Sequence, residues 1–188
     1  GPIIVDKDGN ITVPNEGEHD TEIEAGADTD VELDGTVTVP NGTVINPDGT
    51  VTLPNGTGTV TPNGSVEVDK DGNVTIPTVN GPITVDPAGT ITVPNQDGTT
   101  TVINPNGTVD LPNGAGTITP EGGDATVEED GSVKIPTQDG EITVDPEGNM
   151  TVQNGRAQDT ESEAEAEETA EDNGVTKNKN GTVINPDG

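Results

Sequence analysis

Two short segments carry oxygen-bearing side chains at the alternate positions that calcium loops use. Asp6-Lys7-Asp8-Gly9-Asn10 and Asp69-Lys70-Asp71-Gly72-Asn73 each place two carboxylates and one amide around a glycine. Ca²⁺ takes six to eight oxygen ligands, and carboxylates, amide oxygens and backbone carbonyls are the groups that supply them. The candidate calcium ligands are therefore Asp6, Asp8, Asn10, Asp69, Asp71 and Asn73.

The same segments are also good turn sequences. An EF-hand loop ends on a bidentate glutamate, and neither segment continues to one. An aspartate that accepts backbone amides, followed by a glycine that takes positive φ, reverses the chain without any metal. A weaker copy, Glu128-Glu129-Asp130-Gly131, fits either interpretation. The sequence leaves calcium loops and structural turns as two open hypotheses.

Catalytic chemistry has little to work with in this sequence. His19 is the one histidine, cysteine is absent, and no Ser or Cys stands in a recognisable nucleophile motif. Acid–base catalysis by carboxylates needs a dry cleft that raises the pKa of one of them. A chain without Phe, Tyr or Trp has few large apolar side chains that could line such a cleft. We expect no enzymatic activity and a surface position for His19.

The elements that must position these residues are very short strands joined by tight turns. Val, Ile and Leu alternate with Thr or charged residues over three or four positions, which is typical of a strand with one buried face. Pro, Asn, Asp and Gly separate these runs about every eight residues and exclude helix. The apolar pairs that show this alternation most clearly are Val66/Val68, Val74/Ile76, Ile83/Val85, Ile91/Val93, Val133/Ile135 and Ile142/Val144.

Longer repeats lie above these strand-and-turn units. The segment Gly42–Gly49 returns letter for letter as Gly181–Gly188, which is 139 residues later. Within that period, Thr43–Pro47 returns 58 residues later as Thr101–Pro105, and Ile83–Pro87 returns 59 residues later as Ile142–Pro146. Such self-similarity predicts an array in which each unit packs on its neighbours.

The repeats suggest a division of the chain into blocks and acidic linkers. Residues 1–15 are expected to end one β-repeat block, and residues 35–98 and 99–155 to form two more. Residues 16–34 and 156–173 are acidic and are interpreted as linkers between blocks, because like charges without an apolar stripe oppose folding. Residues 174–188 are expected to start the next repeat.

The fold class predicted from this pattern is an all-β, elongated tandem-repeat array. Without aromatic residues the core must be thin and shared along the chain. A β-solenoid, with stacked coils around a narrow interior of Val and Ile, is the favoured architecture. An antiparallel meander or small β-sandwich, closed by the Pro-Asn-Gly turns, is the alternative.

The charge of the chain limits its partners. It has 36 Asp and Glu against 6 Lys and Arg, for a formal net charge of −30. Nucleic acids and anionic membrane surfaces are bound through clustered Lys and Arg, so neither is an expected partner, and no stretch is apolar enough to insert into a membrane. The expected partners are neighbouring repeats of the same protein, with homo-association into fibres as an extension, and the one cofactor considered is Ca²⁺. No external ligand is indicated.

The stacked Val/Thr strands, Pro-Asn/Asp-Gly turns, acidity and near-identical long repeats resemble the repetitive stalks of bacterial cell-surface adhesins and extracellular fibres. The resemblance implies a structural spacer or filament-forming segment at the cell surface or outside the cell, without catalysis. A calcium-binding adhesive repeat is a second hypothesis. A third is an ice-binding solenoid, because Thr-x-Thr recurs at 36/38, 50/52, 57/59/61, 90/92 and 117/119. A disordered acidic spacer is the fourth.

Overall fold

A computed structural model describes residues 1–154, 176–177 and 183–184, and the chain divides into two compact units, Gly1–Ala157 and Gln158–Gly188. The expected linker 156–173 lies outside the described residues, as does most of 174–188. In the second unit, β20 (Thr176–Lys177) and β21 (Val183–Ile184) form one antiparallel pair.

The first unit is built from nineteen short strands and two single 3₁₀ turns. The strands up to the first 3₁₀ turn are β1 (Ile4–Val5), β2 (Ile11–Val13), β3 (Thr21–Ile23), β4 (Asp30–Val31), β5 (Val37–Thr38), β6 (Val44–Ile45) and β7 (Val51–Thr52), followed by η1 (Pro54–Gly56). The middle strands are β8 (Thr59–Val60), β9 (Val66–Val68), β10 (Val74–Ile76), β11 (Ile83–Val85), β12 (Ile91–Pro94), β13 (Thr100–Ile103) and β14 (Val109–Asp110), followed by η2 (Pro112–Gly114). The last are β15 (Thr117–Ile118), β16 (Thr126–Val127), β17 (Val133–Thr137), β18 (Gly140–Val144) and β19 (Met150–Asn154).

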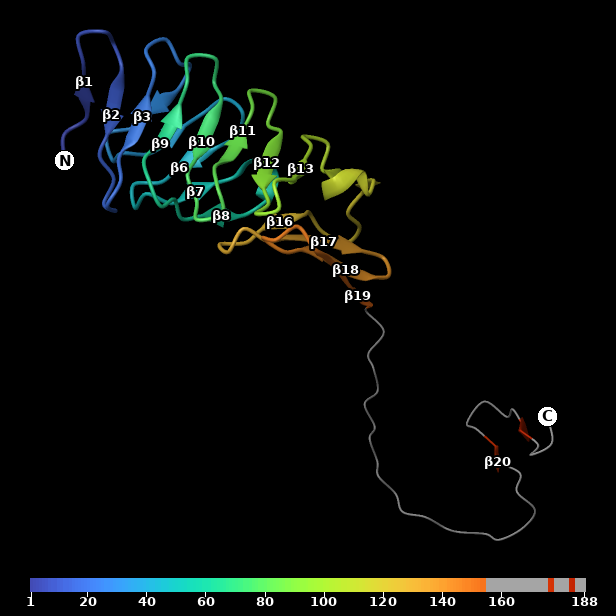
Figure 1. Ribbon diagram of the computed structural model, residues 1–188. Helices are drawn as coiled ribbons and strands as arrows, with labels where there is room; N and C mark the ends of the chain where they lie inside the picture. Colours follow the sequence, from blue (N-terminus) through green and yellow to red (C-terminus); the bar gives the residue numbers. More distant parts are fainter. Residues whose placement is uncertain (155–175, 178–182, 185–188) are drawn as a thin grey trace. The chain divides into compact units, whose positions relative to one another are not determined.

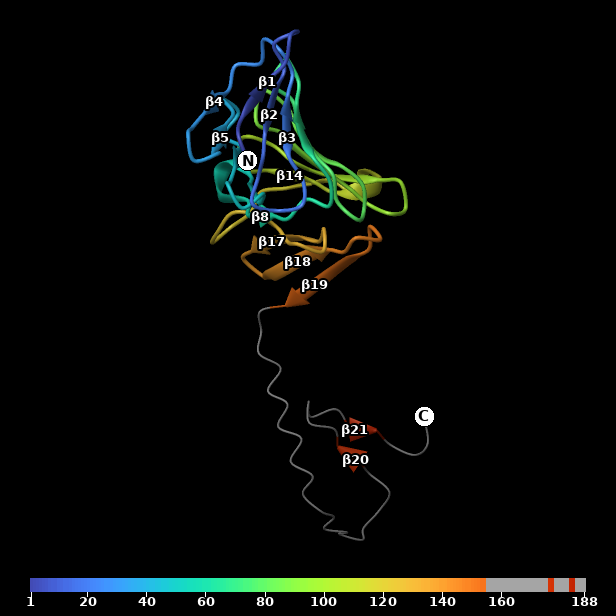
Figure 2. The same cartoon turned by 90° about the vertical axis from the view of Figure 1, so that its left-hand side faces the viewer.

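These strands form three sheets. The ten-stranded sheet has the order β1-β2-β3-β9-β10-β11-β12-β13-β14-β15, and the five-stranded sheet runs in sequence from β4 to β8. The four-stranded sheet runs from β16 to β19. Figure 1 shows the strands of the large sheet side by side from β1 onward, and Figure 2 shows β4 and β5 to one side of β1–β3. The fold class is therefore all-β, as predicted.

The connections make the sheets antiparallel meanders. Strands that are consecutive in the chain and lie in the same sheet pair antiparallel, as in β10–β11, where Val74 faces Val85 and Ile76 faces Ile83. Among the described strands the one parallel pair is β3–β9, where the chain leaves the large sheet for the five-stranded sheet and later returns. The stacked coils of a β-solenoid, our favoured architecture, are not what the structure shows. The turns close hairpins instead, as in the meander alternative, because tight turns join antiparallel strands directly and parallel strands need longer crossovers.

A single hydrophobic core joins all three sheets. It consists of the inward residues of the alternating strands, all of them Val, Ile, Leu or Ala. Val13 and Val85 of the large sheet, Ile45 of the five-stranded sheet and Ile135 of the four-stranded sheet are fully buried in it. Burial of each such side chain stabilises the fold by roughly 1.5–3 kcal/mol relative to exposure. No strand is long enough to bury much surface alone, so the stability depends on the packing of the sheets on one another.

The first acidic segment, residues 16–34, which we expected to be a linker, contains the two short strands β3 and β4. Thr21 and Ile23 of β3 are only 0% and 2% exposed. Two of the acidic residues of the segment, Glu22 and Glu24, occupy exposed positions in this strand and directly after it. Period-two alternation over three residues was too short a signal to outweigh the surrounding charge. The expected block boundary at 98/99 also falls inside a hairpin, since β12 pairs with β13.

Among the described residues no helix has the length and apolar composition needed to cross a membrane.

Candidate functional site

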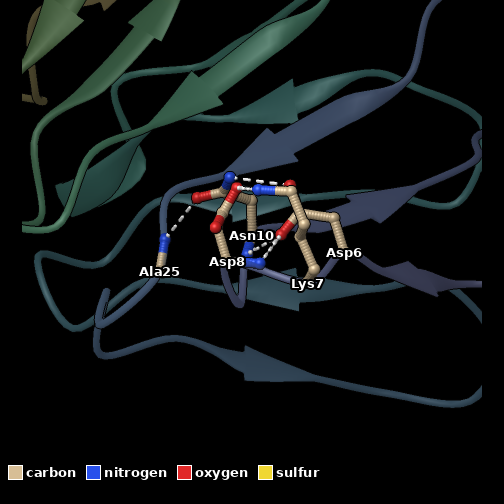
Figure 3. Close-up of polar contacts among 5 residues, drawn as sticks. All are labelled: Asp6, Lys7, Asp8, Asn10 and Ala25. Atoms are coloured by element: carbon tan, nitrogen blue, oxygen red, sulfur yellow. Dashed lines mark hydrogen bonds and ion pairs between the residues drawn. The ribbon is translucent and has the colours of Figure 1, made fainter.

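The first candidate calcium segment is the turn between β1 and β2. Asp6 Oδ1 accepts hydrogen bonds from the backbone N–H groups of Asp8 and Asn10, at 2.8 and 3.0 Å. Asp6 Oδ2 accepts one from Asn10 Nδ2 at 2.9 Å (Figure 3). Asp8 pairs with Lys7 instead. Both carboxylate oxygens of Asp6 therefore accept hydrogen bonds within the turn, and the carboxylates of Asp6 and Asp8 do not converge on one point.

The second candidate segment, between β9 and β10, repeats this arrangement. Asp69 Oδ1 accepts from the backbone N–H groups of Asp71 and Asn73, both at 2.9 Å, and Oδ2 accepts from Asn73 Nδ2 at 2.7 Å. Asp71 pairs with Lys70. The turn between β18 and β19 follows the same plan, with Asn149 donating to both oxygens of Asp145. Sequence reasoning missed that third example because it lacks the second aspartate.

These hydrogen bonds shift the acidity of the turn aspartates. The Asn10 side chain, together with backbone N–H groups of the turn, holds the pKa of Asp6 below its ordinary value. The Asn73 side chain and neighbouring amides do the same to the pKa of Asp69. Donors aimed at a carboxylate favour its charged form. The negative charge on each first aspartate thus has a structural explanation that requires no cation.

A different turn chemistry appears where the first residue is Asn. Asn46 Nδ2 donates to the hydroxyls of Thr50 and Thr52 at 3.0 and 3.1 Å. In this turn the side-chain acceptor is the third residue, Asp48, and not the first, because Asp48 Oδ1 accepts hydrogen bonds from the N–H and the hydroxyl of Thr50. Two sequence patterns, Asp-x-x-Gly-Asn and Asn-x-Asp-Gly-Thr, therefore make turns of the same size with different side-chain hydrogen bonds.

The structure brings the two candidate segments to either side of β3. Asn10 Oδ1 accepts from the backbone N–H of Ala25 at 2.9 Å (Figure 3). Glu24 Oε2 accepts from the backbone N–H of Lys70 at 2.9 Å, and the N–H of Glu24 donates to the carbonyl of Val68. Each turn is thus fastened to the end of the same strand.

An acidic groove of about 290 Å³ lies between the two turns, on the outer face of β2, β3 and β9. In the parallel β3–β9 pair, Glu22 is directly beside Glu67. The carboxylates that line the groove are Asp6, Glu22, Glu24, Glu67 and Asp69. Of the six candidate ligands, Asp6, Asn10 and Asp69 line it, whereas Asp8, Asp71 and Asn73 do not.

Sequence reasoning missed Glu22, Glu24 and Glu67. Their only signal was alternation in outward strand positions, and nothing in the sequence placed β3 between β2 and β9. No group of three or more His, Cys, Asp or Glu side chains is arranged to hold a metal ion in the part of the chain that the structure describes. The groove can attract cations through its charge.

His19 lies in a second hollow, of about 460 Å³, whose lining includes Glu18, Asp48 and Thr61 but no Ser or Cys. Its backbone carbonyl accepts a hydrogen bond from Asn15 Nδ2 at 3.1 Å. The described residues around His19 therefore offer no nucleophile of the kinds considered above.

Thr92, which belongs to one of the Thr-x-Thr pairs, lies in a short row of threonines on the large sheet. Thr75 faces Thr84, and Thr84 faces Thr92, across three adjacent strands. The row ends at Glu67 on one side and at Val102 on the other. A flat lattice of threonines does not extend across this sheet.

One contact between sheets occurs twice. The backbone N–H of Glu16 donates to the carbonyl of Pro47, in the five-stranded sheet, at 2.7 Å. The backbone N–H of Gln96 donates to the carbonyl of Pro146, in the four-stranded sheet, at 2.8 Å. Both donors follow a Val-Pro-Asn sequence at the end of a strand of the large sheet. The large sheet is thus joined to both smaller sheets by the same kind of backbone hydrogen bond, from the residue after Val-Pro-Asn to a proline carbonyl.

No protein-family model and no curated protein matches this chain. Among solved structures, it is similar to the TCP10 domain of Danio rerio CPAP in complex with a peptide of Danio rerio STIL, with 19% identity and a TM-score of 0.27 over 79% of this chain and 81% of that chain. The G-box domain of the microcephaly protein CPAP gives 17% identity and a TM-score of 0.26 over 81% of this chain and 97% of that chain. The wild-type TCP10 domain of Danio rerio CPAP gives 19% identity and a TM-score of 0.20 over 81% of this chain and 94% of that chain. These similarities are too distant to carry an argument about this chain.

Proposed function

We propose that this chain is a structural spacer, a segment of a stalk or filament in a repetitive cell-surface or extracellular protein, and that it performs no catalysis. One observation carries the proposal. The two sequence blocks, residues 35–98 and 99–155, are hydrogen-bonded to each other across their boundary, since Ile91 faces Ile103 and Val93 faces Thr101 in the β12–β13 hairpin.

The way in which the blocks share sheets explains how an array would continue. The second half of the first block, β9–β12, lies in the ten-stranded sheet, and the first half of the next block, β13–β15, extends that same sheet. The equivalent second half, β16–β19, begins a new sheet. The second block thus extends the sheet in which the first block ends and then begins another, so the two blocks share both backbone hydrogen bonds and core. Nearest-neighbour packing of this kind resists bending and extension.

The charge suits a spacer. A net charge of −30 makes neighbouring molecules repel one another over a distance of about 8 Å at physiological ionic strength. The core contains no ionisable group, so this charge lies on the surface. Repulsion between stalks keeps them soluble and apart without weakening the apolar contacts within one chain.

Small-angle scattering tests the proposal. A chain with the 139-residue period of residues 16–154 repeated two and then three times is expected to lengthen by the same increment with each period. The radius of gyration of a compact assembly would instead grow roughly as the 0.38 power of the residue number. Growth of that second kind would overturn the proposal.

Calcium binding is a second candidate because the acidic groove collects Asp6 and Asp69 with Glu22, Glu24 and Glu67. Titration calorimetry in 0.15 M NaCl would detect stoichiometric Ca²⁺ uptake. The Glu22→Gln/Glu67→Gln double variant should then lose it without losing the turns, whereas Asp48→Asn, a turn aspartate outside the groove, should keep it. If the titration heats show no stoichiometry and are equal in all three proteins, the groove attracts cations only diffusely and is not a calcium site.

A further inference from the structure

The ten-stranded sheet is assembled from two separate stretches of the chain. β1–β3 form one stretch and β9–β15 form the other, while β4–β8, which lie between them in the sequence, belong to the five-stranded sheet. The parallel β3–β9 pair joins the two stretches (Figure 1), and three residues of each strand take part in it. Every other pair in this sheet joins strands that are consecutive in the chain. We call the β3–β9 pair the seam of the large sheet.

The pairing at the seam is weaker than the pairing in the hairpins beside it. Parallel ladders are slightly less stable per residue than antiparallel ones. All of β4–β8 separates Ile23 from Val66 in the sequence, so no tight turn holds β3 and β9 in register. In the β10–β11 hairpin, by contrast, the N–H of Gly81 donates to the carbonyl of Thr78 and closes the turn between the strands. The seam therefore depends more on its side chains than those hairpins do.

The outer face of the seam carries two like charges side by side. Glu22 of β3 is directly beside Glu67 of β9. The neighbours on their other sides are uncharged, since Glu22 faces Thr12 of β2 and Glu67 faces Thr75 of β10. The outward pair next along the sheet is Thr75 with Thr84. Like charges directly opposite each other destabilise a strand pair, whereas threonine pairs stabilise it.

The repulsion at the seam is not offset by a cation in the groove. No Lys or Arg is among the described residues that line this hollow. Lys7 and Lys70, in the two turns that flank it, pair with aspartates of their own turns. Three further carboxylates from those turns and from the end of β3 line the same groove: Asp6, Glu24 and Asp69.

The inner face of the seam holds it closed. Its four inward side chains are at most 2% exposed: Thr21, Ile23, Val66 and Val68. The N–H of Val66 donates to the carbonyl of Asp20 at 3.2 Å. The N–H of Glu24 donates to the carbonyl of Val68 at 2.8 Å. Burial and backbone hydrogen bonds on one side thus oppose charge repulsion on the other.

We propose that the seam is the place where the large sheet opens first, and that the charges of Glu22 and Glu67 determine how often it opens. When the seam opens, β1–β3 and β9–β15 each keep their antiparallel ladders, so the opening is local. Added salt shortens the range of the repulsion and closes the seam. The inference rests on the proposed spacer function, to which it adds a joint that stiffens as the ionic strength rises.

Amide hydrogen exchange tests the proposal on the unaltered protein, in buffer without divalent cations. The seam amides, those of Glu24 and Val66, should be about tenfold less protected than the hydrogen-bonded amides of the β11–β12 ladder. In about 0.5 M NaCl their protection should rise several-fold, because the repulsion is screened. Seam amides as protected as those of the β11–β12 ladder, or indifferent to salt, would overturn the proposal.

Charge substitutions test the role of the two glutamates. Glu22→Gln and Glu67→Gln should each slow exchange of the seam amides about threefold, which is in the range for one cross-strand pair. The double variant should gain little more, because both substitutions remove the same repulsion. Glu141→Gln makes the same change in net charge on a strand where the neighbours are Pro136 and Gln153, and it should leave the seam amides unchanged. An equal effect of Glu141→Gln, or no effect of Glu67→Gln, would overturn the proposal.

Thiol labelling gives a second measurement, since the chain has no cysteine of its own. Ile23 at the seam and Ile91 in β12 are 2% and 0% exposed, and Ile23→Cys and Ile91→Cys remove the same atoms. The thiol of Ile23→Cys should react at least about tenfold faster under native conditions, because local opening exposes it. Equal rates would mean that both thiols are exposed only by global unfolding, and the proposal would be wrong. None of these results depends on how tandem periods lengthen in scattering, so the spacer function can stand when the seam proposal fails.

Discussion

Truncation of two equivalent valines should have very different costs. Val93 and Val152 occupy the same place in the repeat, each after a threonine in the third position of its strand. Val93 is 1% exposed between two neighbouring strands, whereas Val152 is 61% exposed on the outermost strand. The substitutions Val93→Ala and Val152→Ala therefore make the same chemical change in two tertiary environments.

The magnitudes follow from the buried carbon atoms. Loss of two carbons at about 0.8 kcal/mol each removes about 1.6 kcal/mol of transfer free energy at Val93. The cavity that remains raises the total to about 2–3 kcal/mol. At Val152 about two fifths of the side chain is buried and no cavity forms, so the loss is about 0.6 kcal/mol.

Urea unfolding followed by far-ultraviolet circular dichroism is the suitable assay, because the chain has no Trp, Tyr or Phe for fluorescence. Thermal unfolding should show a decrease of about 4–12 °C for Val93→Ala, at roughly 2–4 °C per kcal/mol. Equal losses of the free energy of unfolding at the two sites would refute the argument that the neighbouring strand, and not the local sequence, determines burial.

Three other outcomes follow from single contacts. Gly58→Ala should cost about 1–3 kcal/mol more than Gly116→Ala in urea unfolding, because the new Cβ would lie 2.8 Å from the Val127 carbonyl oxygen at Gly58 and near nothing at Gly116, both glycines having positive φ. Similar costs would mean that the close approach of Gly58 to the Val127 carbonyl, where the five- and four-stranded sheets meet, does not limit the side chain at position 58. The pKa of Asp69 is lowered by hydrogen bonds within its turn, so its contribution is present above the unfolded pKa of about 3.9 and is lost as the pH falls through the lower folded value. The stability advantage of the unaltered protein over Asp69→Asn should shrink from pH 5 to pH 2, and a constant difference would contradict this. Asn55 has φ 59°, so Asn55→Ala should lose about 1–2 kcal/mol and Asn55→Gly very little, while equal losses would point to the side chain instead.

Part of the candidate site was readable from the sequence. The segments at Asp6 and Asp69 were identified as turns or calcium loops, and the structure places a turn at both, with the carboxylate oxygens bonded to amides. The acidic groove was not predicted. It depends on Glu22 and Glu67 lying side by side, and these residues are far apart in the chain. Their proximity comes from the return of the chain to the large sheet after β8, a step without a local sequence signal.

Local structure followed from local sequence. Alternation with period two specified the strands, and the Pro, Asn, Asp and Gly positions specified the turns, since both depend on backbone preferences and on contacts within a few residues. The all-β class and the thin, aromatic-free core were determined at this level.

Only the tertiary structure decided which strands are neighbours. Backbone edges are chemically alike, so a Val-x-Ile strand can pair with many others. The choice among partners is made by the burial of whole faces, which is a property of all three sheets together. For that reason β3, although acidic residues surround it in the sequence, is a paired strand of the large sheet next to β9. For the same reason the valine of a Thr-Val sequence is buried at Val93 and exposed at Val152.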